Sequence, residues 1–153
     1  MGRWHQIALL PNRFQDFCVG DTTADYSLRD DGRVRVVNQC RDASGALRRA
    51  EGVARVNPRY GDPARLEVRF APAWLGFLPF VWGDYWILDL TPDYGAVLVG
   101  APDRDYLWIL AREAPLDPDI YAAFVAHARR AGFPVERLVL EDPAAVAADP
   151  PRD

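Results

Sequence analysis

Alternating apolar and polar residues, in short runs between turn residues, dominate the chain. In Arg65–Phe70, for example, Leu66, Val68 and Phe70 alternate with three charged residues. This period of two is typical of a β-strand that buries one of its two faces. The pattern predicts eight strands, which are Arg3–Leu10, Thr22–Leu28, Arg33–Cys40, Ala50–Val56, Arg65–Phe70, Asp84–Leu90, Gly95–Gly100 and Asp105–Arg112.

The second and third strands are separated by Asp30–Gly32, a three-residue loop of the kind that closes β-hairpins. This loop places Leu28 opposite Val34 and Tyr26 opposite Val36. The apolar faces of the two strands then coincide, so we expect this register.

The last three predicted strands are apolar on both faces, and such strands are covered on both sides. A helix within Pro115–Pro134 is placed to cover them. Asp117 suits its N-cap, Pro118 its first position and Gly132 its end. Its apolar stripe consists of Ile120, Phe124, Val125 and Ala128.

The predicted fold is all-β, an eight-stranded antiparallel up-and-down β-barrel with one C-terminal α-helix packed on its outside. Eight antiparallel strands close most simply into a barrel without free edges. A further short strand is expected at Arg137–Glu141. We expect residues 1–142 to form one domain and residues 143–153 to form a disordered tail.

The composition argues for a folded domain without a nucleic-acid partner. The 153 residues are 50% hydrophobic and 26% charged, with a net charge of −4. Charges of both signs are interleaved, so the sequence carries no basic surface for nucleic acid.

No membrane-spanning helix or leader peptide is predicted. The longest apolar window, residues 71–90, is interrupted by two prolines and two aspartates, whereas a span needs about 20 mostly apolar residues. The chain opens directly with strand-like "MGRWHQIALL", so it shows neither a signal peptide nor a lipidation cysteine.

The sequence predicts no metal site or cofactor. It has two cysteines, Cys18 and Cys40, and two distant histidines, His5 and His127. These are too few for a zinc site, and no Gly-rich phosphate loop is present. From the residues alone, the cysteines are either two thiols or one disulfide.

Three motifs occur in order along the predicted strands. "GRW" (Gly2–Trp4) begins the first strand, "LTPDYGAVLVG" (Leu90–Gly100) forms a turn between two strands, and "DYLWILAR" (Asp105–Arg112) ends before the helix. This arrangement resembles the lipocalin family. The stretches "YSLRDDG", "GDYWILDL" and "PDRDYLWIL" are similar to bacterial lipocalins in particular.

The resemblance implies structural roles for five residues. An arginine packs over a tryptophan at the closed end of the lipocalin barrel, which assigns Arg112 and Trp4 to that contact. The remaining motif residues, which form the first-strand glycine and the turn, are Gly2, Asp93 and Tyr94.

The inward faces of the strands are the predicted ligand site. Parity from Arg112 places Tyr106, Trp108 and Leu110 on the inner side, and the resemblance places Tyr85, Ile87 and Asp89 inward. Either these side chains fill the barrel or they line a cavity. The predicted ligand-binding residues are Tyr26, Val36, Val68, Phe70, Tyr85, Ile87, Tyr106 and Trp108.

The resemblance implies a carrier, not an enzyme, that binds, transports or stores a fatty acid or lysophospholipid in the barrel. Relatives work in the cell envelope, so the expected location is the periplasm or outer membrane. There an oxidised Cys18–Cys40 pair is the expected state. Bacterial members commonly begin with a lipoprotein signal, so we also expect that a segment preceding Met1 is missing from this sequence.

Two other functions remain as alternatives. The apolar loop at residues 73–86, rich in aromatic residues and interrupted by Pro79, is either packed on the barrel rim or a contact for a membrane, a protein or a second copy of the chain. An enzyme on the same barrel would depend on Asp89 inside it. A flat-ring pigment is a further candidate ligand.

Overall fold

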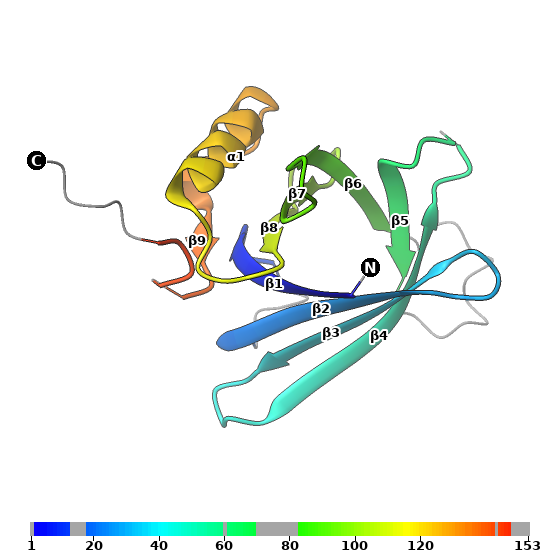
Figure 1. Ribbon diagram of the computed structural model, residues 1–153, viewed down its shortest axis with the longest axis horizontal. Coiled ribbons are helices and arrows are strands. Elements are labelled where there is room, and N and C mark those ends of the chain that lie inside the picture. The colour runs from blue at the N-terminus through cyan, green and yellow to red at the C-terminus, as the bar shows by residue number, and fades with distance from the viewer. Residues whose placement is uncertain (1, 13–17, 60, 70–82, 143, 148–153) are drawn as a thin grey trace, which may run out of the picture.

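The computed structural model of the chain (Figure 1) describes residues 2–12, 18–59, 61–69, 83–142 and 144–147. The predicted residue Phe70 and most of the apolar loop, residues 73–82, lie outside the described residues.

Eight antiparallel strands form a closed barrel, as the sequence predicts. Each strand pairs with the next along the chain, and β1 pairs with both β2 and β8. In Figure 1, β1–β4 form one long wall and β5–β8 close above it. The strands are β1 (Gly2–Leu9), β2 (Gly20–Leu28), β3 (Val34–Arg41), β4 (Leu47–Val56), β5 (Arg65–Arg69), β6 (Gly83–Leu90), β7 (Ala96–Gly100) and β8 (Leu107–Ala111).

The β2–β3 hairpin has the predicted register. Leu28 pairs with Val34 and Tyr26 pairs with Val36. The register shifts between Gly20 and Thr23, where β2 diverges from its regular pairing. β4 begins three residues earlier than predicted because its polar N-terminal half still pairs along β3.

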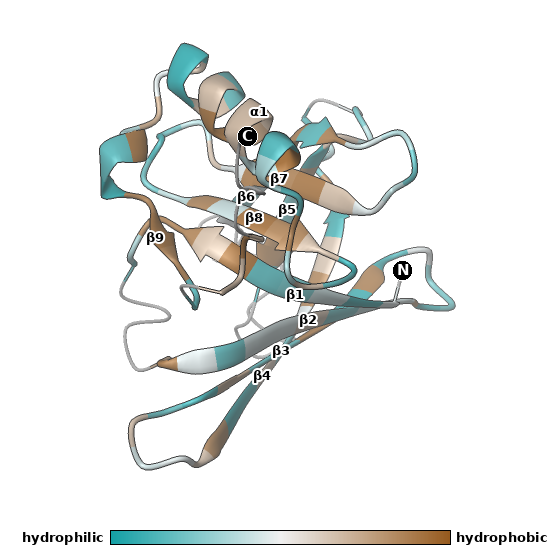
Figure 2. Cartoon of the chain, turned by 60° about the vertical axis from the view of Figure 1, so that its left-hand side comes forward, coloured by the Kyte–Doolittle hydropathy of each residue, from teal (hydrophilic) through white to brown (hydrophobic). Residues whose placement is uncertain are grey.

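The helix α1 (Pro118–Arg130) covers the outer face of β6–β8 (Figure 2). Asp117 caps it by accepting a hydrogen bond from the backbone N–H of Asp119. Phe124 and Ala128 of the helix are buried in one cluster with Leu98, Leu107 and Ile109. The predicted helix therefore provides the predicted cover.

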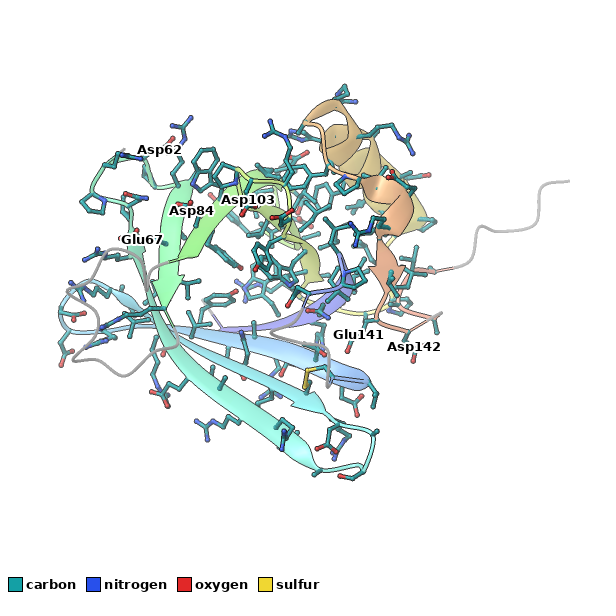
Figure 3. The ribbon with its side chains drawn as sticks, turned by 180° about the vertical axis from the view of Figure 1, so that it is seen from behind. Asp62, Glu67, Asp84, Asp103, Glu141 and Asp142 are labelled. Carbon is teal, nitrogen blue, oxygen red and sulfur yellow. A yellow bond between two sulfur atoms is a disulfide. The ribbon has the colours of Figure 1, made fainter. Side chains whose placement is uncertain are left out.

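A short C-terminal strand pairs with the end of β1, beyond the residues of β1 that pair with β2. After the 3₁₀ turn η3 (Val135–Arg137), β9 (Val139–Leu140) pairs with Ala8 and Leu9 of β1. The backbone N–H of Glu141 then donates to the Ile7 carbonyl. The Glu141 carboxylate accepts from the Thr22 backbone N–H at 2.9 Å and from Gln6 Nε2 at 2.6 Å. Figure 3 shows Glu141 beside the ends of β1 and β2.

Part of the expected disordered tail is ordered. Leu116 forms a parallel bridge with Val146, and its backbone N–H donates to the Ala145 carbonyl at 2.8 Å. Ala145 is buried in the cluster beneath the helix. Apolar contact thus holds residues 144–147, three of which are alanines, against the domain.

The inward placement of Asp89 is wrong, because β6 contains an irregularity. Ile87 pairs with Val99, but Asp89 pairs with Leu98, so the register shifts across Leu88. Leu88 packs in the outer cluster, and Asp89 Oδ2 lies 3.0 Å from His127 Nδ1 of the helix. Leu90 takes the inward position instead and borders the barrel interior.

β5 has the predicted parity but not the predicted exposure. Leu66 and Val68 face inward, so Glu67 and Arg69 face outward. Nevertheless Glu67 is only 8% exposed and Arg69 only 7%. Glu67 (Figure 3) accepts a hydrogen bond from Arg55 Nε at 2.6 Å, which compensates part of its burial.

Candidate ligand-binding cavity

The barrel encloses a cavity of about 710 Å³, and its lining is mainly apolar. This volume lies in the range of about 300–1,000 Å³ that is usual for small-molecule sites. The described lining contains no acidic residue, and Arg112 is its one charged residue. The barrel interior is therefore a cavity rather than a filled core.

Six of the eight predicted ligand-binding residues border this cavity. They come from β2, β3, β5, β6 and β8, so the alternation of each strand brings them to one space. Whether they contact a ligand stays a prediction. These six residues are Tyr26, Val36, Val68, Tyr85, Ile87 and Trp108.

Tyr106 is not among the described residues that line the cavity, and whether it contacts a ligand stays a prediction. It precedes β8 and stacks on Trp108, with ring centroids 5.8 Å apart. It instead borders a smaller pocket of about 220 Å³ together with Arg104 and Arg137. The strand β8 itself begins one residue later, at Leu107.

Sequence reasoning missed a polar part of the wall. Gln6 on β1, Thr22 on β2 and Asn38 on β3 border the cavity near the strand ends where the β1–β2 and β3–β4 connections lie. The period-two positions that share a face with Trp4, Tyr26 and Val36 include these three residues. The alternation is the signal that places them inward, although the predicted ligand-binding set named only apolar and aromatic residues.

Trp4 and Arg112 meet at the opposite end of the barrel. The Arg112 guanidinium carbon lies 4.0 Å from the centroid of the Trp4 ring, a cation–π distance. Gly2 has a φ of +86°, and a Cβ there would lie 3.1 Å from Arg112 Nη1. A glycine at this position therefore lets the arginine lie over the ring.

The turn between β6 and β7 is held by its own side chains. Thr91 Oγ1 donates to Asp93 Oδ1 at 2.7 Å, and the backbone N–H of Gly95 donates to the same carboxylate at 2.9 Å. These hydrogen bonds lower the pKa of Asp93, with the Thr91 hydroxyl the largest cause. Tyr94 follows with a left-handed φ of 58° and also borders the cavity.

Two tyrosine hydroxyls meet inside the cavity. Tyr26 Oη and Tyr85 Oη lie 2.6 Å apart, so one hydroxyl donates to the other. Burial raises the pKa of Tyr26 to about 12 and raises the pKa of Tyr85 well above its ordinary value. Both phenols are therefore neutral over the physiological range. Tyr85 also stacks on Trp108 at 6.1 Å.

Cys18 and Cys40 form a disulfide with a Cα–Cα distance of 5.6 Å. The bond joins the segment before β2 to β3, near the end where the polar wall lies. Of the two states that the residues alone allowed, the structure has the oxidised one.

Asp89, the residue on which an enzyme hypothesis depended, lies outside the cavity. Asp89 and His127 pair on the outside of the barrel, away from the cavity. In the described ranges, no group of three His, Cys, Asp or Glu residues is placed to hold a metal ion. No helix within these ranges has both the length and the apolar character needed to cross a bilayer.

Comparisons with known proteins agree with this architecture. A family model for a lipocalin-like domain matches residues 1–143. The chain is 40% identical to temperature-induced lipocalin-1 of Arabidopsis thaliana over 90% of this chain and 74% of the relative. It is 37% identical to outer membrane lipoprotein Blc of Escherichia coli K12 over 91% of this chain and 74% of the relative.

Solved structures agree on the fold. Lobster apocrustacyanin A1 superimposes with a TM-score of 0.70 at 20% identity, covering 91% of this chain and 74% of the crustacyanin. The matched family model and the two relatives establish that the chain belongs to the lipocalin family, whose members typically carry small hydrophobic ligands.

Proposed function

We propose that this lipocalin binds a single-chain lipid, a fatty acid or lysophospholipid, in the barrel cavity. The unfilled cavity of about 710 Å³ with a mainly apolar lining carries the proposal. Each methylene that leaves water contributes about 0.8 kcal/mol, so an acyl chain gains most of its binding free energy from burial.

The polar part of the wall suits a lipid head group. Gln6, Thr22 and Asn38 lie on three neighbouring strands, near the ends from which the β1–β2 and β3–β4 connections leave. Their amide and hydroxyl groups provide hydrogen bonds without a buried charge. We therefore expect the head group at this end and the acyl chain between the walls of β5–β8 and β2–β3.

A role in the cell envelope is part of the proposal. Two observations support it: the relationship to proteins named outer membrane lipoprotein and the disulfide between Cys18 and Cys40. Disulfides persist mainly in oxidising compartments, such as the bacterial periplasm. Transport or storage of lipids between envelope sites is the role that fits a carrier there.

A titration of lipids against a cavity-filling variant tests the binding function. Ala54 borders the cavity and is 4% exposed, so Ala54→Phe would occupy space needed by the acyl chain. Ala122→Phe is the matched control because Ala122 is exposed on the helix. We expect palmitate and palmitoyl lysophosphatidylcholine to bind with one site per chain by titration calorimetry.

The affinity of Ala54→Phe should be at least about ten-fold lower, because the phenyl ring prevents several methylenes of the acyl chain from being buried in the cavity. The Ala122→Phe control should bind like the natural chain. Failure of the natural chain to bind either lipid, or unchanged binding in Ala54→Phe, would refute the proposal.

A further inference from the structure

The tyrosine hydrogen bond crosses the interior of the barrel. Tyr26 belongs to β2 and Tyr85 to β6. Three strands separate β2 from β6 in either direction around the closed sheet, so the two residues come from opposite walls. Their hydroxyl oxygens are 2.6 Å apart and both side chains border the cavity. An elongated ligand that fills the cavity must therefore pass beside this pair.

The pair has one more donor than it uses. Two phenols carry two O–H groups, and only one of these donates in the bond between them. No further acceptor for the second O–H is found among the described residues. Both side chains border the cavity, so a bound ligand would cut this O–H off from water. A donor that loses water and gains no acceptor costs roughly 1–3 kcal/mol, so an acceptor on the ligand is favoured at this point.

The surroundings of the pair favour an uncharged acceptor. Arg112 is the one cation of the described lining, and its guanidinium lies over the Trp4 ring. Trp108 stacks on Tyr85, and both residues belong with Ile87 to one apolar cluster. Burial in this environment raises the pKa of both tyrosines, and the same burial opposes any other anion, including a carboxylate.

We propose that the Tyr26–Tyr85 pair recognises a neutral oxygen on the acyl chain of the bound lipid, either an ester carbonyl or a chain hydroxyl. The inference rests on the proposed lipid-binding function and specifies the chemical class of ligand. It distinguishes acyl lysolipids and hydroxylated fatty acids from lipids that carry neither oxygen, such as ether lysolipids and unsubstituted fatty acids.

Two matched ligand pairs isolate the oxygen. Palmitoyl lysophosphatidylcholine is compared with its hexadecyl ether analogue, which lacks only the ester carbonyl oxygen. Stearate is compared with a stearate that carries one mid-chain hydroxyl. Each pair is titrated into the natural chain, into the double variant Tyr26→Phe/Tyr85→Phe and into Tyr121→Phe. Tyr121 lies on the helix, outside the cavity lining, and is the matched control.

In the natural chain and in Tyr121→Phe, the oxygen-bearing member of at least one pair should bind about ten-fold more tightly, the value of one good hydrogen bond. In the double phenylalanine variant this ratio should fall to about one. A preference in the lysolipid pair alone assigns the ester carbonyl, and a preference in the stearate pair alone assigns the chain hydroxyl. Circular dichroism establishes that the double variant is folded.

Two results would overturn the inference while leaving lipid binding intact. The first is a ratio near one in the natural chain for both pairs. The second is a preference that persists in the folded double variant, because the oxygen would then be bound elsewhere in the cavity. If none of the four lipids binds to the natural chain, the proposed function itself fails and this inference falls with it.

Discussion

The two faces of β6–β8 differ in how completely they are packed. On the outer face, Leu98, Leu107 and Ile109 have no exposed surface and lie in one cluster with Phe124 of the helix. On the inner face, Tyr85, Ile87 and Trp108 remain partly exposed because they border the cavity. The same strands thus form a close-packed layer on one side and the wall of the cavity on the other.

This difference separates stability from binding. Close-packed side chains contribute both transfer free energy and dispersion contacts, whereas side chains beside an empty space contribute less. We infer that the layer beneath α1 stabilises the domain and that the inner wall is available for a ligand. The remaining β2–β4 side lies outside the helix-covered cluster and has the Cys18–Cys40 disulfide instead.

The largest expected effect comes from matched truncations on the two faces. Ile109→Ala on the outer face should lower the free energy of unfolding by about 2–5 kcal/mol, because a fully buried side chain leaves a cavity. Ile87→Ala on the inner face should cost only about 1 kcal/mol, because its side chain already borders open space. Denaturant unfolding measures both values. Equal losses at the two positions would contradict the comparison.

The same variants should have the opposite order in lipid binding. Ile87→Ala removes apolar contact with the acyl chain and should weaken binding several-fold, at about 0.8 kcal/mol per lost methylene contact. Ile109→Ala should leave the affinity unchanged at temperatures where it is folded.

Removing the disulfide tests the β2–β4 side. The double variant Cys18→Ser/Cys40→Ser frees a loop that spans a sequence separation of 22. The expected loss in the free energy of unfolding is about 3 kcal/mol, mainly through the entropy of the unfolded chain. Thermal unfolding of the natural chain with and without reductant is a second measurement. An unchanged unfolding temperature in both experiments would show that this side does not need the bond.

Alkaline pH should weaken the inner face selectively. The pKa of Tyr26 is about 12 in the folded protein and about 10 in an unfolded chain, so folding favours the neutral phenol. This contribution is fully present below pH 10 and is lost as the pH rises towards 12, by up to about 2 kcal/mol. Unfolding measured at pH 9 to 12, relative to Tyr26→Phe/Tyr85→Phe, isolates the effect. Parallel pH curves for the two proteins would argue against it.

The smallest effect is expected at the rim of the outer face. Asp89 and His127 are both partly exposed, so their pair should contribute less than about 1 kcal/mol. Asp89→Asn should therefore change stability little and leave lipid affinity unaltered, because Asp89 points away from the cavity. A large loss of lipid binding in Asp89→Asn would contradict this prediction, because it would show that the carboxylate contributes to the binding site.

The alternation of residues predicts much of this architecture. All eight strands and the helix follow from local periodicity and caps, and the register of Tyr26 with Val36 follows from one loop. The outer positions Leu107 and Ile109 follow from the parity set by Arg112. These features depend on residues that are close together in the sequence, so the sequence alone is enough to predict them.

Features that depend on distant segments escape this reasoning. The irregularity at Leu88 reverses the side on which Asp89 lies, and a period of two gives no sign of it. Glu141 accepts a hydrogen bond from Gln6 of β1 at a sequence separation of 135. The contact between Tyr26 and Tyr85 depends on the barrel diameter, which is set by all eight strands together.

The most direct test of whether the cavity holds a lipid is native mass spectrometry. The freshly purified chain is measured before and after solvent extraction. The account predicts one extractable adduct of fatty-acid or lysophospholipid mass per chain, which returns when lipid is added back and is lost in Ala54→Phe. A chain that has only its bare mass, both as purified and after incubation with palmitate or palmitoyl lysophosphatidylcholine, would contradict it.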